Sequence, residues 1–478
     1  MEEKNLKQKT KKALYWKFAE QFSNYGVTFI VGIFMARLLS PSDYGITALP
    51  AVFMAIAAAF VEAGFTSALI RKPEINDDDL TTTFIYSTIV GIVCYVLLFV
   101  SSPWIADFYN TPVLKPLMRV TALSFIFYPI GVPQTILLKR KLDFKTPAKI
   151  TVFVRILSGV VGLTMAYTGY GVWALVISTL FSSVADTILK LIFVRWLPRG
   201  KWSKESFAYL WNYGNKMMLS GMLTTVYGNI TPIIVGKFYS TSDLGIYNRA
   251  HGYAMLPSQQ IYSVVMEVSF PVLSKIQDDT EKLLATYRRM INTSTFVIFP
   301  IMMLLAAIAR PVIIVMITEK WADCIILLQL LCFALMWYPV HGINLNMLMV
   351  KGRSDLFLKL EIIKRVLGIT VMCCSLPFGL VAFCGAQIAS SVLSVYINTW
   401  YTGKFFDFGF FKQMKDILPT LILGLIMFVS VTLFIQLIDY MMLQIILGGL
   451  LGVSIYLGGA FLFKFRQIDD IKYLLNRK

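Results

Sequence analysis

Residues 36–46 read Ala36-Arg-Leu-Leu-Ser-Pro-Ser-Asp-Tyr-Gly-Ile46, and residues 236–246 read Gly236-Lys-Phe-Tyr-Ser-Thr-Ser-Asp-Leu-Gly-Ile246. Both segments contain a basic residue, two apolar residues and the pattern Ser-x-Ser-Asp-x-Gly-Ile at the same spacing. A second pair of similar segments, Ile75-Asn-Asp-Asp78 and Ile276-Gln-Asp-Asp279, lies at almost the same separation. Because an internal repeat indicates a repeated structural unit, the chain is predicted to contain two similar halves.

The composition indicates a membrane protein that crosses the bilayer many times. Of the 478 residues, 57% are hydrophobic and only 15% are charged, whereas a soluble domain has about 25% charged residues. The six cysteines show no CxxC spacing, and the chain has only two histidines, so no metal site is expected. Lipid is the environment that this much apolar surface requires.

Fourteen segments are apolar and long enough to span a bilayer, which takes about 20 residues. Of the 44 Lys and Arg residues, 34 fall in segments on the side of the N-terminus and 4 in loops on the other side. This asymmetry predicts cytosolic N- and C-termini, and it explains most of the net charge of +17 without a nucleic-acid partner. The predicted spans are 13–37, 45–70, 81–101, 117–138, 147–167, 171–194, 208–236, 245–270, 290–309, 322–349, 357–376, 380–402, 416–437 and 442–463.

The repeat and the spans together predict an all-α architecture of two six-helix lobes. Six spans separate the two copies, so both halves enter the membrane in the same direction, as in transporters with parallel repeats. The predicted parts are an N-lobe (1–200), a C-lobe (201–403) and two extra spans with a cytosolic tail (404–478). The loops are too short for a soluble catalytic domain, and no nucleotide-binding motif is present, so the chain is not expected to be an enzyme.

The repeated segments themselves are expected to mark the symmetry and not to bind substrate. The charge asymmetry places both at the outer surface, after the first span of each lobe. Asp43 and Asp243 are predicted to cap the helices that follow, and Gly45 and Gly245 to allow close turns.

Polar residues line one face of several predicted spans. Ionisable residues inside a membrane are costly and usually face protein or a water-filled cavity. A hydrated cavity between the two halves is therefore expected, because a two-fold axis would bring spans one, seven and eight to the centre. The alternative for each residue is a polar tie between helices. The stripes contain Lys17, Glu20, Asn24 and Thr28 in span one, Lys216, Ser220, Thr224, Tyr227 and Thr231 in span seven, and Arg249, Tyr253, Gln260, Ser263 and Glu267 in span eight, with Glu62 in span two.

Six short motifs resemble the polysaccharide transporters of the MATE-like MOP superfamily, specifically Wzx-type oligosaccharide flippases of the colanic-acid-exporter kind. Their order and spacing carry the resemblance, which extends from about residue 10 to about residue 400. The motifs are Arg37-Leu-Leu-Ser-Pro-Ser-Asp-Tyr-Gly45, Pro112-Val-Leu-Lys-Pro-Leu-Met-Arg119, Gly171-Val-Trp-Ala-Leu175, Leu244-Gly-Ile-Tyr-Asn-Arg-Ala250, Pro271-Val-Leu-Ser-Lys-Ile-Gln-Asp278 and Pro377-Phe-Gly379.

The resemblance implies a MATE-like fold in the bacterial cytoplasmic membrane. It also implies that the chain moves an undecaprenyl-diphosphate-linked oligosaccharide, the repeat unit of an O-antigen, capsule or exopolysaccharide, to the outer leaflet. The expected partners are this lipid-linked substrate, the membrane lipids, and a polymerase or other glycan-assembly proteins. No cofactor is expected, although coupling to H⁺ or Na⁺ is left open.

On this basis each polar residue is given an expected role. Basic groups would hold the diphosphate electrostatically, hydroxyl, amide and aromatic groups would contact sugar, and carboxylates would bind the coupling ion. The expected diphosphate contacts are Lys216 and Arg249, the sugar contacts are Tyr253, Tyr227, Gln260 and Asn24, and the coupling-ion candidates are Glu20, Glu62 and Glu267.

Two other functions remain open from the sequence. A MATE-type cation–drug antiporter has the same architecture but is expected to have a cavity dominated by acidic residues. A membrane glycan polymerase or ligase needs a catalytic surface at the outer face, and the short outer loops argue against one.

Overall fold

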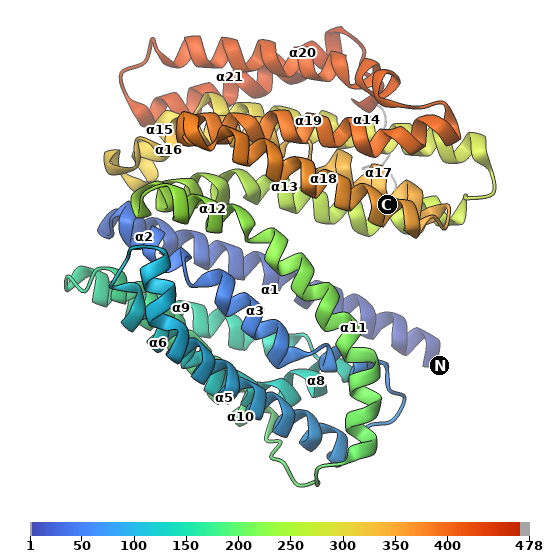
Figure 1. The fold of residues 1–478 in the computed structure, drawn as a ribbon. Helices are drawn as coiled ribbons and strands as arrows, with labels where there is room; N and C mark the ends of the chain where they lie inside the picture. Colours follow the sequence, from blue (N-terminus) through green and yellow to red (C-terminus); the bar gives the residue numbers. More distant parts are fainter. Residues whose placement is uncertain (1, 469–478) are drawn as a thin grey trace. The chain divides into compact units, whose positions relative to one another are not determined.

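The computed structural model describes residues 2–468, which form helices and no strand (Figure 1). The α-helices are α1 (Glu2–Leu38), α2 (Pro41–Ala48), α3 (Ala51–Glu62), α4 (Phe65–Arg71), α5 (Asp77–Phe108), α6 (Leu114–Ala122), α7 (Ser124–Phe127), α8 (Val132–Arg140), α9 (Lys145–Tyr167), α10 (Val172–Val194), α11 (Lys204–Gly228), α12 (Ile230–Phe238), α13 (Thr241–Lys275), α14 (Thr280–Ala307), α15 (Ala309–Ile317), α16 (Cys324–Leu335), α17 (Tyr338–Val350), α18 (Ser354–Ser375), α19 (Gly379–Phe406), α20 (Phe410–Ile435) and α21 (Met441–Leu462). Three 3-10 helices are η1 (Tyr128–Gly131), η2 (Glu319–Trp321) and η3 (Leu376–Phe378).

The predicted class, an all-α protein that crosses the membrane many times, is confirmed. Among the described residues, 11 helical stretches are long and apolar enough to cross a membrane. One of them, Ser354–Phe406, contains both α18 and α19, which η3 and Gly379 at φ 88° separate. Helices α1 and α13 are not among the 11, so the number of fourteen spans stays a prediction.

The chain forms two compact units, Met1–Gly245 and Ile246–Lys478. The lobes 1–200 and 201–403 and the tail 404–478 were predicted from the internal repeat, and these boundaries stay a prediction. Helix α11 lies beyond residue 200, the predicted end of the N-lobe, yet it packs against α3, α4 and α5 of the first unit.

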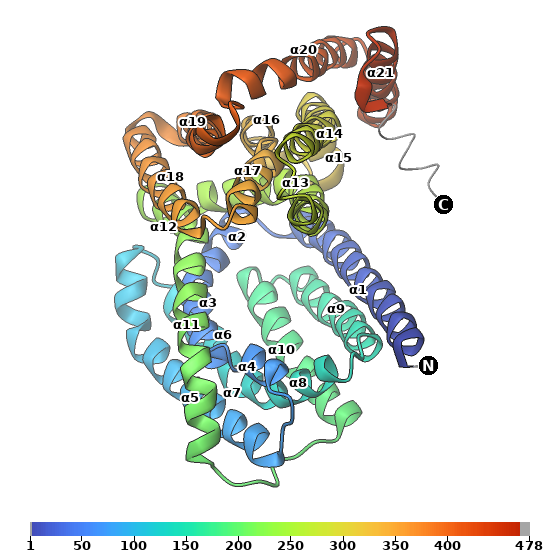
Figure 2. The same ribbon diagram turned by 90° about the vertical axis from the view of Figure 1, so that its right-hand side faces the viewer.

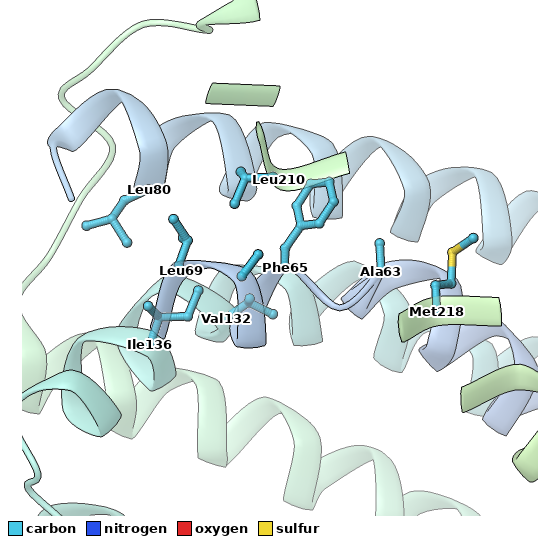
Figure 3. Close-up of a cluster of buried hydrophobic side chains, with 9 residues drawn as sticks. Ala63, Phe65, Leu69, Leu80, Val132, Ile136, Leu210 and Met218 are labelled. Atoms are coloured by element: carbon cyan, nitrogen blue, oxygen red, sulfur yellow. The ribbon is translucent and has the colours of Figure 1, made fainter. Parts of the chain in front are cut away.

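In the first unit, α9 packs between α1 and α10, and α5 packs against α3 and the α6–η1–α8 segment (Figure 2). A core of buried apolar side chains joins α4, α5, α8 and α11 (Figure 3). Phe65 and Leu69 of α4 meet Leu210 of α11 there, and each of the three is fully buried. These contacts explain why α11 belongs to this unit.

Two glycines set the distance between α11 and the junction of α3 and α4. Ala63 and Gly64 adopt positive φ values of 40° and 69°, and this turn ends α3. A Cβ on Gly214 of α11 would lie 2.3 Å from the carbonyl oxygen of Ala63, and one on Gly64 would lie 2.8 Å from the carbonyl oxygen of Gly214. The two backbones are therefore in direct contact, as small residues allow between membrane helices.

In the second unit, a buried polar network joins α14, α17 and α20. The Tyr287 hydroxyl donates to Asn344 Oδ1 at 2.6 Å, and Gln413 Nε2 donates to the same oxygen at 3.1 Å and to Tyr287 at 2.9 Å. All three side chains are fully buried. This network ties α20, one of the two extra helices at the C-terminal end, to the helices before it.

The two copies of the repeated segment touch each other within the first unit, which includes the first turn of α13. Ser42 Oγ and Thr241 Oγ1 are 2.8 Å apart. A Cβ on Gly45 would lie 1.7 Å from the carbonyl oxygen of Thr241, and one on Gly245 would lie 1.9 Å from the carbonyl oxygen of Pro41. The glycines thus let the starts of α2 and α13 pack backbone against backbone.

The expected capping role of the two aspartates is confirmed. The Asp43 carboxylate accepts from the Ser40 amide at 2.9 Å while the Ser40 hydroxyl accepts from the Asp43 amide, and Ser240 and Asp243 form the same bonds. The expected role of the glycines in close turns is wrong, because Gly45 and Gly245 lie inside helices and serve the contact between them.

We expect Gly45→Ala and Gly245→Ala each to lower the free energy of unfolding by roughly 1–3 kcal/mol, because an added methyl group must push two backbones apart. Thermal unfolding of the purified protein in detergent measures this change. The control is Gly252→Ala in the same helix α13, where an added Cβ meets no atom within 4 Å. Equal stability of Gly45→Ala and Gly252→Ala would contradict the contact.

Candidate functional site

In the first unit, Asn24 of α1 accepts a hydrogen bond from Arg155 Nε of α9 at 3.1 Å. Glu20 lies one turn before Asn24 and lines a groove of about 590 Å³ with Trp16, Lys149 and Phe153. The predicted polar face of span one is thus turned partly toward α9. The bond from Arg155 is what a tie between helices requires, and sugar contact by Asn24 stays a prediction.

A second polar cluster surrounds Glu62, at the end of α3. Its carboxylate is hydrogen-bonded to the Tyr128 hydroxyl of η1. Tyr128 also interacts electrostatically with Asp186 of α10, which forms an ion pair with Lys190 at 2.7 Å. Three elements of the first unit therefore bring two carboxylates, a hydroxyl and an ammonium group into one neighbourhood.

Lys216 and Tyr227 lie on the same face of α11, because eleven residues are close to three helical turns. The opposite face carries Leu210, Gly214 and Met218, which are buried where α11 packs against α3, α4 and α5. Lys216 is exposed and Tyr227 half-buried. The polar stripe predicted for span seven thus points away from the helices that hold α11.

In the second unit, two aromatic rings hold Arg249 of α13. Its guanidinium carbon lies 5.7 Å from the ring centre of Tyr253 and 5.5 Å from that of Trp321, within the range of cation–π attraction. Gln260 is half-buried and Glu267 exposed further along the helix. Arg249 and Glu267 are about 27 Å apart along the helix axis, so the structure brings Tyr253 to Arg249 but not Glu267.

One ionic cluster, in which Lys364 and Arg365 meet Glu361, was not among the polar residues singled out from the sequence. Both lie within helix α18, inside the stretch Ser354–Phe406 that is apolar enough to span a membrane. Lys364 forms an ion pair with Glu361, and these side chains are only 11% and 21% exposed. Arg365 Nε lies 3.5 Å from the same carboxylate.

Aromatic and polar groups of neighbouring helices face this cluster. Glu361 acts electrostatically on Tyr262 of α13 and Tyr338 of α17, whose ring centres are 4.4 Å apart. Lys364 interacts electrostatically with the half-buried His341 of α17, which contacts Ser391 and Asn398 of α19. The spacing Glu-x-x-Lys-Arg inside an apolar run was the signal that could have revealed it.

Among residues 2–468, no group of three or more His, Cys, Asp or Glu side chains has the geometry of a metal site. The six cysteines are free, and four of them are buried. The polar groups described above can hold charged or hydroxyl-bearing ligands by ion pairs and hydrogen bonds.

A family model described as "Polysaccharide biosynthesis protein" matches residues 34–326. The teichuronic acid biosynthesis protein TuaB of Bacillus subtilis is 26% identical over 379 residues, 78% of each chain. The lipopolysaccharide biosynthesis protein WzxC of Escherichia coli is 25% identical, with 76% of this chain and 74% of the relative covered. The succinoglycan biosynthesis transport protein ExoT of Rhizobium meliloti is also 25% identical, over 64% of this chain and 62% of the relative.

Two solved structures share the fold. The lipid II flippase MurJ, in an inward closed conformation, superposes with a TM-score of 0.73 at 17% identity over 95% of this chain and 100% of the other. A multidrug resistance MATE family transporter of the MOP superfamily superposes with a TM-score of 0.60 at 15% identity, over 85% of this chain and 95% of the other. The predicted MATE-like fold is therefore confirmed.

We expect Glu361→Gln to lower the stability by roughly 3 kcal/mol, because it leaves the ammonium group of Lys364 largely buried without its carboxylate. Thermal unfolding measures the loss, and the double variant with Lys364→Met should recover most of it. Lys359→Met, which changes an exposed lysine of the same helix, serves as the control. Equal stability of the single and double variants would contradict the pairing.

Proposed function

Because the chain belongs to the polysaccharide biosynthesis protein family, we propose that it flips an undecaprenyl-diphosphate-linked oligosaccharide across the cytoplasmic membrane. The cargo would be the repeat unit of an O-antigen, capsule or exopolysaccharide. The observation that carries the proposal is the polar stripe of α11, which leaves Lys216 exposed on a membrane-spanning helix, opposite the face that packs on the first unit.

The physical task explains the residue types. A sugar and a diphosphate cannot enter hydrocarbon without a polar path, whereas the polyprenyl chain can stay in lipid. Lys216 and Arg249 are the proposed contacts of the diphosphate. The rings of Tyr253 and Trp321 hold the guanidinium of Arg249 in place, which supports its use as a fixed anion-binding group.

The remaining polar residues are proposed to serve the sugar and the coupling ion. Tyr227, Tyr253, Gln260 and Asn24 carry the hydroxyl and amide groups that hydrogen-bond to sugars. Glu20, Glu62 and Glu267 are proposed for coupling to H⁺ or Na⁺. Of these three, Glu62 has the most developed environment, since it shares a neighbourhood with Tyr128 and Asp186.

The division of the chain into two compact units supports alternating access, in which one unit moves against the other. We place both termini in the cytosol and assign no catalytic reaction to the chain. A polymerase and other glycan-assembly proteins are the proposed partners that consume the flipped repeat unit.

We expect Lys216→Ala and Arg249→Ala together to reduce flipping of a polyprenyl-diphosphate oligosaccharide by about tenfold or more, because each removes a charge-assisted contact with the diphosphate. Proteoliposomes with a labelled lipid-linked sugar measure the rate. Lys282→Ala changes a lysine side chain that is 71% exposed and is not among the proposed contacts, so it should leave the rate unchanged.

Full activity of the double variant would remove this assignment of the anion-binding residues. Deletion of the gene distinguishes the function itself: loss of surface glycan with accumulation of the lipid-linked repeat unit supports flipping. Drug sensitivity with a normal surface glycan would instead support cation–drug antiport.

A further inference from the structure

A basic pocket lies at one end of the second unit, where α14 and α20 begin and the chain leaves α21. Its volume is about 1030 Å³. Four basic side chains line it, together with one carboxylate among the described residues, that of Asp416. The basic residues are Arg288, Arg289, Lys415 and Arg466.

The single carboxylate is already engaged by one of these arginines. Arg288 donates to both oxygens of Asp416 at 2.9 Å and lies over the ring of Phe408. Four positive groups and one negative group give the described lining of the pocket a positive balance. A ligand with negative charge is therefore the one that complements it.

An apolar wall continues from the basic groups along α20. Leu418, Ile422 and Ile426 follow one another at intervals of one turn, and each is about half exposed, at 48%, 48% and 50%. This stripe is about 12 Å long, close to the thickness of the hydrocarbon in one leaflet. The pocket thus has basic groups that can bind an anionic headgroup and an apolar surface that can contact an alkyl chain.

Asn292 of α14 adds a polar group to the same lining. Its Oδ1 atom is buried and accepts no hydrogen bond from the part of the chain that the structure describes. A headgroup with hydroxyl donors suits such an acceptor better than a bare phosphate does.

We propose that this pocket binds an anionic glycerophospholipid of the inner leaflet, with its phosphate among Arg289, Lys415 and Arg466 and an acyl chain along α20. Basic pockets between helices on the cytoplasmic side of a membrane are suited to anionic headgroups. The lipid would join α14, α20 and the end of α21, and so stabilise the two C-terminal spans. This proposal does not depend on the transported substrate.

The test is thermal unfolding of the full-length protein in detergent during titration with phosphatidylglycerol. A ligand that binds the folded state raises the unfolding temperature in proportion to its occupancy. The variant Arg289→Gln/Lys415→Gln/Arg466→Gln should need about tenfold more phosphatidylglycerol for the same shift. The control Lys275→Gln/Lys282→Gln/Lys404→Gln removes the same charge outside the pocket and should respond like the wild type.

Phosphatidylcholine, inorganic phosphate and undecaprenyl phosphate separate the possible ligands. The proposal expects a larger shift with phosphatidylglycerol than with any of the three. An equal response to phosphatidylcholine, or unchanged phosphatidylglycerol affinity in the pocket variant, would overturn it. A stronger response to undecaprenyl phosphate or to free phosphate through the same residues would also overturn it. If the triple variant does not fold, Lys415→Gln and Arg466→Gln are measured singly, with the same criteria.

Discussion

Helices inside a bilayer gain little from the hydrophobic effect when they pack on one another, because lipid is as apolar as their side chains. What holds them together is close approach of backbones and hydrogen bonding between buried polar groups. Close approach of backbones occurs in the first unit, at Gly45 against Thr241 and at Gly214 against Ala63. Buried hydrogen bonding occurs in the second unit, in the Tyr287–Asn344–Gln413 network. Both solutions restrict the sequence to small or mutually satisfying residues at the contact.

This constraint separates the polar residues of the membrane region into two kinds. Asn344 and Gln413 satisfy each other in the core, so they are fully explained as ties between helices. Lys216 of α11 and Glu267 of α13 are exposed, so burial in a helix contact does not explain them. Residues of the second kind need a hydrated surface or a ligand, which is the physical reason for seeking transport there.

The all-helical class and the caps of α2 and α13 could be predicted from sequence because both rest on local patterns. Apolar runs identify spans, and Ser-x-x-Asp identifies a helix start. The contact between Gly45 and Gly245 could not be predicted, because it joins residues 200 positions apart whose sequence signature also fits a turn. The ion pair of Glu361 and Lys364 was missed for a related reason. Both residues fall in one predicted span, but only the packing shows that they pair and are largely buried.

The boundary between the two compact units falls inside the continuous helix α13. Gly245 belongs to the first unit through its contact with Pro41, and Arg249 follows one turn later in the second. About 6 Å of helix therefore separates the repeat contact from the arginine proposed to bind substrate. The repeated motif binds no substrate in the proposed mechanism. Its role is structural, because its contact with α2 sets how the first turn of α13 packs within the first unit.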